Sequence, residues 1–325
     1  MKNNLQVAFA SKLVAMLKVA VVAFSLAIFV AIPALGQGEP TQILVSADGK
    51  SSAKLDGSTI TIEVSGHKGP PLTWEPLAPS ATQVVLMIDD GVRETIIREM
   101  DNLRTFVRTL PEGMQVMIAY MQYGRVVAAQ GFTTDHERAA AALHLPQGVP
   151  GASASPYVCL SDFVKNWPGS ETAVSSTGGT PRHKARVVLM ISNGVDPYNG
   201  STSILNQDST YVSAAVTATQ RAGVAVSAIY FGDSGINGTS ANDSGQNYLS
   251  QVATNTGGIS LWQGMGNPPS LEPYLKEFQQ ALASTYIAGF LATPGRNPDE
   301  LVRVKISGPH VKLHAPSQIL PGNRE

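Results

Sequence analysis

Cysteine and charge are both scarce in this chain of 325 residues. Cys159 is the only cysteine, which excludes a disulfide within the chain and a metal cluster built from cysteines. Charged residues make up 14% of the sequence, and 23 basic residues balance 24 acidic ones. A nucleic-acid-binding protein needs a basic surface, so this composition argues against nucleic acid as a partner. Apolar residues, at 43%, are enough for a sizeable core, and we expect Cys159 to be buried in it.

The N-terminus has the pattern of a secretory signal peptide. Three lysines within the first 18 residues precede an apolar run at 19–35, and small residues, Ala34 and Gly36, stand three and one places before Gln37. This pattern predicts cleavage after Gly36 and a periplasmic or secreted protein. An uncleaved N-terminal anchor in the inner membrane is the alternative, because the run approaches the ~20 residues that a spanning helix needs. A membrane contact is expected only in that case.

Residues 37–80 read as an N-terminal β segment followed by a linker. The stretch 59–64 alternates polar and apolar residues and is rich in β-branched side chains, which is typical of a strand. Four prolines then favour a linker: Pro70, Pro71, Pro76 and Pro79.

Residues 81–284 alternate the patterns of strands and helices. Apolar runs at 84–88 and 187–191 each end in polar residues and a glycine, as strands buried on both faces of a parallel sheet do. Helical spacing of apolar residues follows the first run, over 93–109. The alternation predicts an α/β fold with a doubly wound, mostly parallel sheet and helices on both faces. Residues 125–130 are expected to pair with the preceding strand, and the Gly-, Asn- and Ser-rich stretch 232–246 is expected to be a loop.

Residues 285–325 are predicted to form C-terminal strands and a tail. The stretches 285–292 and 301–307 have strand patterns and are expected to pair with each other. Together with the N-terminal β segment, they should form either a small β appendage or strands added at the edge of the main sheet.

Ligands of an open α/β sheet bind at the carboxyl ends of the strands. This rule brings Asp89, the loop at 153–155 and Asn193 to one potential site. The three segments, in this order and spacing, resemble the von Willebrand factor A (vWA) family over residues 80–307. The C-terminal stretches 286–290 and 302–306 resemble a branch of this family common in acidobacterial genomes.

The resemblance implies a protein-binding domain with a metal-ion-dependent adhesion site. Such a site has Asp-x-Ser-x-Ser after the first strand, a Thr from a second loop and an Asp after the fourth strand. These oxygen ligands suit Mg²⁺, which needs octahedral geometry. Asp89 matches the first Asp of this pattern. Other residues occupy the remaining positions: Gly91, Arg93, Ser153 or Ser155, and Asn193.

The substitutions leave alternatives for the chemistry of this degenerate site. An arginine at position 93 could pair with Asp89 in place of a cation. A weak site for Mg²⁺ or another divalent cation could instead keep Asp89 as a ligand, with Asp90 and Asp196 as further oxygen donors. Asp89 could also simply cap the helix that follows it.

The sequence shows no arrangement of residues typical of an enzyme. It has neither the His-Glu-x-x-His spacing of a zinc protease nor the Gly-x-Ser-x-Gly turn of a serine hydrolase. We therefore expect a non-enzymatic module without a cofactor that binds a protein partner, with Tyr157, Tyr198 and Trp262 as candidate exposed anchors. The alternatives are a structural scaffold subunit of a bacterial envelope assembly without a ligand site, and a hydrolase whose site escapes recognition.

Overall fold

The computed structural model describes residues 38–48, 55–92, 94–148, 155–169, 184–199, 208–232, 234–262, 264, 268–309 and 311–323. The predicted signal peptide, Arg93 and Ser153 lie outside the described residues. The chain divides into two compact units, Met1–Gly38 and Glu39–Glu325, and the second unit contains every element below. No helix in the described ranges is long and apolar enough to cross a membrane.

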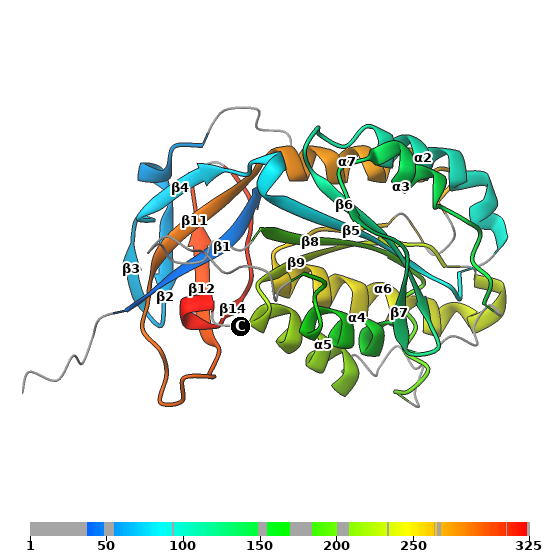
Figure 1. The fold of residues 1–325 in the computed structure, drawn as a ribbon. Helices are drawn as coiled ribbons and strands as arrows, with labels where there is room; N and C mark the ends of the chain where they lie inside the picture. The colour runs from blue at the N-terminus through cyan, green and yellow to red at the C-terminus, as the bar shows by residue number, and fades with distance from the viewer. Residues whose placement is uncertain are drawn as a thin grey trace, which may run out of the picture. The chain divides into compact units, whose positions relative to one another are not determined.

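A six-stranded sheet with helices on both faces forms the centre of this unit (Figure 1). Its strands are β5 (Thr82–Asp89), β6 (Gln115–Gln122), β7 (Arg125–Thr133), β8 (Ala185–Ser192), β9 (Val224–Tyr230) and β10 (Ser260–Leu261). The helices are η3 (Glu94–Glu99), α2 (Met100–Arg108), α3 (His136–Ala141), α4 (Pro156–Lys165), α5 (Thr210–Arg221), α6 (Ser234–Thr256) and α7 (Glu272–Ala283). The helix predicted over 93–109 thus begins as a 3₁₀ segment, η3, before it continues as α2.

The strand order is β10-β9-β8-β5-β6-β7, and every neighbouring pair is parallel except β6 and β7. This is the doubly wound, Rossmann-like fold predicted from the alternating pattern. The chain leaves β5 toward β6 and later returns to β8 on its other side. The order of connections therefore reverses between β5 and β8, where such folds bind ligands at the carboxyl ends of the strands.

Two apolar layers hold the sheet between its helices. Helices α2, α3 and α7 cover one face, and α4, α5 and α6 cover the other (Figure 1). The five residues 84–88 at the centre of β5 are all fully buried, since their side chains point alternately into the two layers. Cys159 is 1% exposed and belongs to the second layer, as predicted.

The loop predicted over 232–246 is wrong, because α6 begins at Ser234 and runs through this stretch. Helix propensity is low in this stretch, but packing against the rest of the fold outweighs it. Asn242 and Ser244 are buried, and a Cβ added at Gly245 would lie 2.2 Å from the carbonyl oxygen of Asn193. Only glycine lets the helix backbone approach the 193–195 segment this closely.

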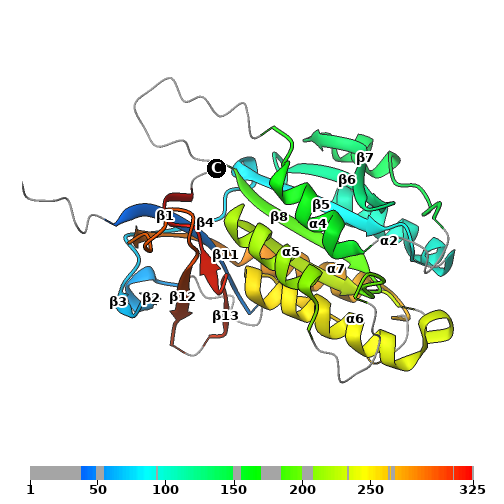
Figure 2. The same ribbon diagram turned by 90° about the horizontal axis from the view of Figure 1, so that it is seen from below.

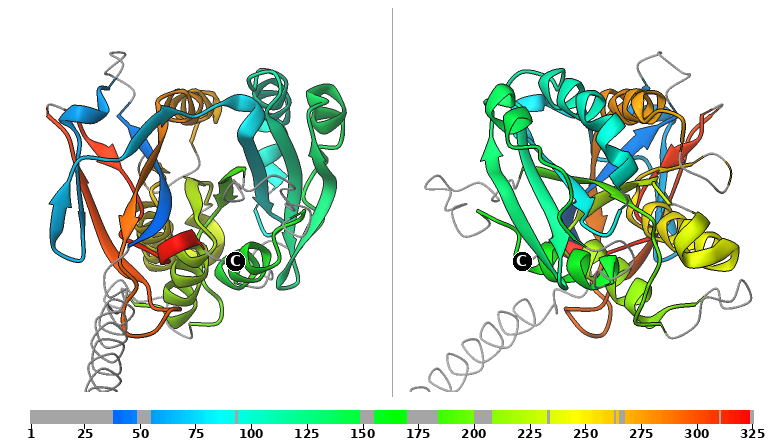
Figure 3. Two further views of the ribbon diagram at one scale, coloured as in Figure 1. Left: turned by 60° about the vertical axis from the view of Figure 1, so that its left-hand side comes forward. Right: turned by 90° about the vertical axis from the view of Figure 1, so that its right-hand side faces the viewer.

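Two four-stranded sheets form a second body of β structure (Figure 3). Their orders are β13-β1-β11-β4 and β14-β12-β2-β3. The strands are β1 (Glu39–Ala47), β2 (Thr61–Val64), β3 (His67–Gly69), β4 (Thr73–Pro76), β11 (Thr285–Ala292), β12 (Val302–Ser307), β13 (Leu313–His314) and β14 (Gln318–Ile319). Short 3₁₀ turns lie at Gly57–Thr59, Pro79–Ala81 and Pro321–Asn323. Apolar residues of both sheets share one core, so the sheets form a sandwich.

The predicted pairing of 285–292 with 301–307 is wrong. Strand β11 lies between β1 and β4 in one sheet, whereas β12 lies between β2 and β14 in the other. The N-terminal strands occupy both edges of β11, so the chain crosses to the second sheet before β12 begins. Of the two arrangements left open, the structure has separate sheets, not strands added to the six-stranded sheet.

Candidate functional site

A buried chain of hydrogen bonds joins β5 to β8 at the carboxyl ends of the strands. Asp89, the last residue of β5, is 2% exposed. Its Oδ2 accepts a hydrogen bond of 2.7 Å from the hydroxyl of Ser192, the last residue of β8. The Ser192 Oγ in turn accepts the Gly194 N–H at 2.9 Å, and Asp89 Oδ1 accepts the Gly91 N–H at 2.9 Å. The Asp89 carboxylate thus holds the loop after β5 and the loop after β8 at the point where the strand order reverses.

Asp90 points to a different loop from its neighbour. Its Oδ1 accepts the Gln147 N–H at 2.7 Å, and Gly148 packs so closely that an added Cβ would lie 2.7 Å from the Asp90 carbonyl oxygen. The two adjacent carboxylates therefore hold separate loops.

The side chains of Asn193 and Asp196 accept hydrogen bonds from the segment that joins β8 to α5. Asn193 Oδ1 accepts the Val195 N–H at 2.9 Å, which closes a turn within its own loop. Asp196 is 3% exposed, and its Oδ2 accepts the hydroxyl of Ser209 at 2.7 Å, just before α5 begins. These contacts fix the start of α5 beside the end of β8.

Ser155 starts α4 at the same edge of the sheet. It is fully buried, and its hydroxyl has no hydrogen-bond partner among the described residues. One turn further on, burial raises the pKa of the Cys159 thiol to about 12, with the charge of Asp89 as the next cause. Burial likewise raises the pKa of Tyr157 well above its usual value, and the Tyr157 hydroxyl donates to the Gly194 carbonyl at 2.6 Å.

The residues at the vWA positions do not fit an octahedral divalent-cation site. Gly91 has no side chain, and Asn193 Oδ1 already accepts a backbone N–H. Both oxygens of Asp89 accept hydrogen bonds, and Ser155 supplies the one hydroxyl among the described positions 89, 91, 155 and 193. An octahedral Mg²⁺ would lack the two hydroxyls and the second carboxylate of the family pattern, and water would have to supply most of its ligands. No group of three His, Cys, Asp or Glu residues in the described ranges is placed to hold a metal.

Two of the three aromatic side chains predicted as anchors are exposed. Tyr198 and Trp262 are 51% and 48% exposed, as the sequence predicts, but Tyr157 is fully buried. Its apolar neighbours on α4 and its bond to Gly194 explain why it packs inside. Two further tyrosines were not predicted: Tyr123 is 83% exposed in the β6–β7 turn, and Tyr211 packs against Tyr198 with ring centroids 5.7 Å apart.

Ser192 is the residue of this candidate site that sequence reasoning missed. It directly follows the apolar run 187–191, one position after the β8 residue that pairs with Ile88 in β5. A hydroxyl at the end of that run, level with an aspartate at the end of the first run, was the available signal.

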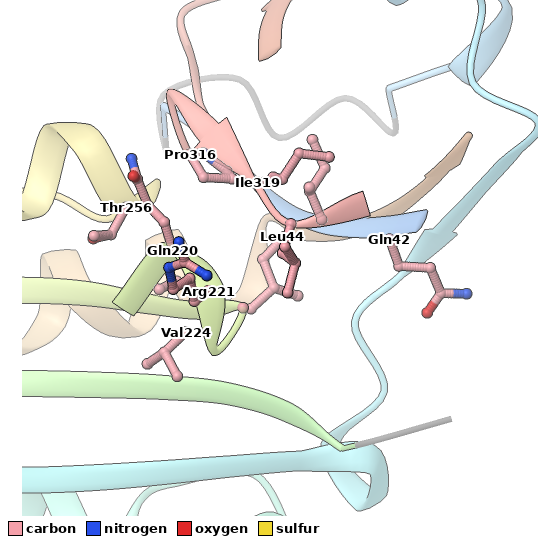
Figure 4. Close-up of a pocket in the computed structure, with 12 residues that line it drawn as sticks. Gln42, Leu44, Gln220, Arg221, Val224, Thr256, Pro316 and Ile319 are labelled. Carbon is pink, nitrogen blue, oxygen red and sulfur yellow. The ribbon is translucent and has the colours of Figure 1, made fainter. Parts of the chain in front are cut away.

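A pocket lies at the opposite end of the strands, where β9 begins (Figure 4). Its lining includes Leu44 of β1, Arg221 and Val224 beside the α5–β9 turn, and Ile319 of β14. None of the predicted site residues contributes to it.

No protein-family model and no curated protein sequence matches this chain. Solved structures with a similar fold include an aerotolerance-related membrane protein from Bacteroides fragilis (12% identity, TM-score 0.40, covering 62% of this chain and 98% of that one). They also include BatB from Bacteroides thetaiotaomicron (15% identity, TM-score 0.40, 62% and 97%). A third is a von Willebrand factor type A protein from Catenulispora acidiphila (10% identity, TM-score 0.39, 88% and 75%). Because these identities and TM-scores are low, we assign the fold class from the chain's own strand order. The resemblance to an acidobacterial branch stays a prediction.

Proposed function

We propose that this chain is a non-enzymatic protein-recognition module of the vWA type with a degenerate adhesion site. Its partner docks on the carboxyl edge of the six-stranded sheet. The observation that carries the proposal is the distribution of exposed large apolar side chains over the described residues. Three of the nine lie elsewhere, at Leu72, Val127 and Leu291, and six lie in segments at this edge. The six are Ile97, Tyr123, Leu145, Tyr198, Tyr211 and Trp262.

The topology of the sheet explains why these six residues lie at the same edge. The residues lie after the carboxyl ends of β5, β6, β8 and β10, at the start of α5, or beside the loop that Asp90 holds. Aromatic side chains that are exposed in the free protein are favoured anchors of protein interfaces, because they bury a large area with few rotatable bonds. The hydrogen bonds of Asp89, Asp90 and Asp196 support this surface by fixing the loops that carry it.

The experiment is capture of a partner from an envelope extract by the immobilised protein. We expect the double variant Tyr198→Ala, Trp262→Ala to lose the captured protein. The matched control Leu72→Ala, Leu291→Ala removes two apolar side chains of the β sandwich that are at least as exposed, and this variant should retain the captured protein. Equal capture by both variants would favour the scaffold alternative, in which this edge binds nothing.

We further propose that the first 36 residues direct export and are removed. The apolar run and the small residues before Gln37 support this. N-terminal sequencing of protein purified from the periplasm or medium should begin at Gln37. Retention of Met1 in a membrane fraction would instead support the anchor.

A further inference from the structure

Strand β7 is an outer edge of the six-stranded sheet and pairs with β6 alone among the described strands (Figure 2). Monomeric proteins usually protect such an edge with prolines, lysines or very short strands. Strand β7 has nine residues, contains no proline, and carries one charged residue, Arg125. Two irregularities interrupt its pairing with β6 beyond Ala128, so the regular stretch 125–128 is the part of this edge that lacks such protection.

The turn before β7 determines which backbone groups point outward. Tyr123 and Gly124 both have positive φ, at 48° and 83°, and join Gln122 to Arg125 in a two-residue hairpin turn. The Gln122 carbonyl of such a turn accepts the Arg125 N–H. Hydrogen-bonded and non-hydrogen-bonded pairs then alternate along the hairpin. Residues 126 and 128 consequently present their N–H and C=O groups to the free edge.

We propose that two copies of this chain associate by antiparallel pairing of their β7 edges about a two-fold axis at Val127, which joins two six-stranded sheets into one. Val126 of each copy then exchanges two hydrogen bonds with Ala128 of the other. This pairing uses the regular part of β7, since the register irregularities with β6 begin beyond Ala128. The inference does not depend on the proposed partner-binding function.

The side chains of β7 suit a second copy in this register. Val127 is 41% exposed and lies against its own counterpart, with the two Cα atoms about 4.5 Å apart as in a non-hydrogen-bonded pair. The two Arg125 side chains lie level with Ala129 of the opposite copy, so no like charges face each other.

Tyr123 is 83% exposed in the turn that begins β7, and a Cβ built at Gly131 meets no atom within 4 Å. Neither residue therefore blocks the approach of a second copy. An extended peptide from another protein could use the same backbone groups, but it would lack the self-matched valine at the axis.

Analytical ultracentrifugation of the purified protein over a concentration series tests the proposal. We expect a reversible monomer–dimer equilibrium. Val127→Lys places two ammonium groups directly opposite each other and should raise the dimer dissociation constant by about tenfold or more. Leu291→Lys makes the same charge change at another exposed strand position and should leave the constant unchanged. A monomer at every concentration, or a dimer that Val127→Lys does not weaken, would overturn the proposal.

A cysteine at the axis gives a second, independent measurement. Val127→Cys brings two thiols to a Cα separation of about 4.5 Å, within the range that a disulfide spans. The native Cys159 is buried, so it does not compete for oxidation. We expect Val127→Cys to form a covalent dimer on mild oxidation and Leu291→Cys to stay monomeric. Equal cross-linking of both variants would count against the pairing, whatever the outcome of partner capture.

Discussion

Replacing Ser192 with alanine removes one hydroxyl from the contact between β5 and β8, and the structure sets the size of the effect. The hydroxyl donates to Asp89 at 2.7 Å and accepts the Gly194 N–H at 2.9 Å, and Ser192 is fully buried. A hydrogen bond to a charged group contributes about 1.5–3 kcal/mol. A buried N–H left without an acceptor costs about 1–3 kcal/mol more. Because the two effects overlap, we expect Ser192→Ala to lower the free energy of unfolding by about 3 kcal/mol.

Urea unfolding followed by circular dichroism measures this loss. Ser213→Ala is the control, because Ser213 is exposed on α5 and such changes alter stability by less than about 0.5 kcal/mol. The slope of the transition should match the wild type, since the area exposed on unfolding is unchanged. A Ser192→Ala protein as stable as the Ser213→Ala control would refute the role given to this hydrogen-bond chain.

Three further predictions concern the helix α6, the binding of a divalent cation and the partly buried His314. Gly245→Ala should destabilise the protein by more than about 2 kcal/mol in thermal unfolding, although alanine normally favours helices, because its Cβ meets the Asn193 carbonyl at 2.2 Å. Calorimetric titration with Mg²⁺, Mn²⁺ or Ca²⁺ should show no saturable binding; saturable binding lost in Asp89→Ala would contradict the poor fit of this site. Burial, then the charge of Lys312, lowers the pKa of His314, so the unfolded chain binds more protons and stability falls as the pH drops below about 6.5. Unfolding measured between pH 7 and 5 should show a weaker pH dependence in His314→Gln.

The fold class could be predicted from the sequence because the central strands consist of uninterrupted runs of apolar residues. Residues 84–88 and 187–191 are buried on both faces, and no other common arrangement places such runs between amphipathic helices. The pairing of β11 with β1 could not be predicted, because strand patterns specify which face is buried and not which distant strand lies alongside. Only the second half of α6, over 247–256, has a helical pattern in the sequence. The stretch 234–246 escaped prediction because its glycine and asparagine residues are stabilised by packing, which local propensity does not include.

The candidate site was predictable in position but not in detail. The end of the first apolar run and the rule for open sheets placed Asp89 at the carboxyl edge. The sequence could not show that Ser192 would occupy one carboxylate oxygen, or that Asn193 would close a turn on itself. The burial of Tyr157 also depends on a bond to Gly194 from a distant loop. Contacts between loops decide these details, and sequence spacing does not encode them.

The β sandwich takes strands from both ends of the described chain. It therefore cannot form until the C-terminal strands have been synthesised. Glu39 in β1 pairs with Ala292 in β11, and β2 pairs with β12. A ribosome releases the N-terminal strands long before their partners emerge, and contacts between residues so far apart in the sequence form slowly. During that interval β1 has no strand to pair with and β2 has β3 alone, so their apolar residues stay open to aggregation. A chain interrupted after α7 would therefore keep the α/β sequence intact and still leave β1 and β4 without the strands that they pair with, which favours aggregation.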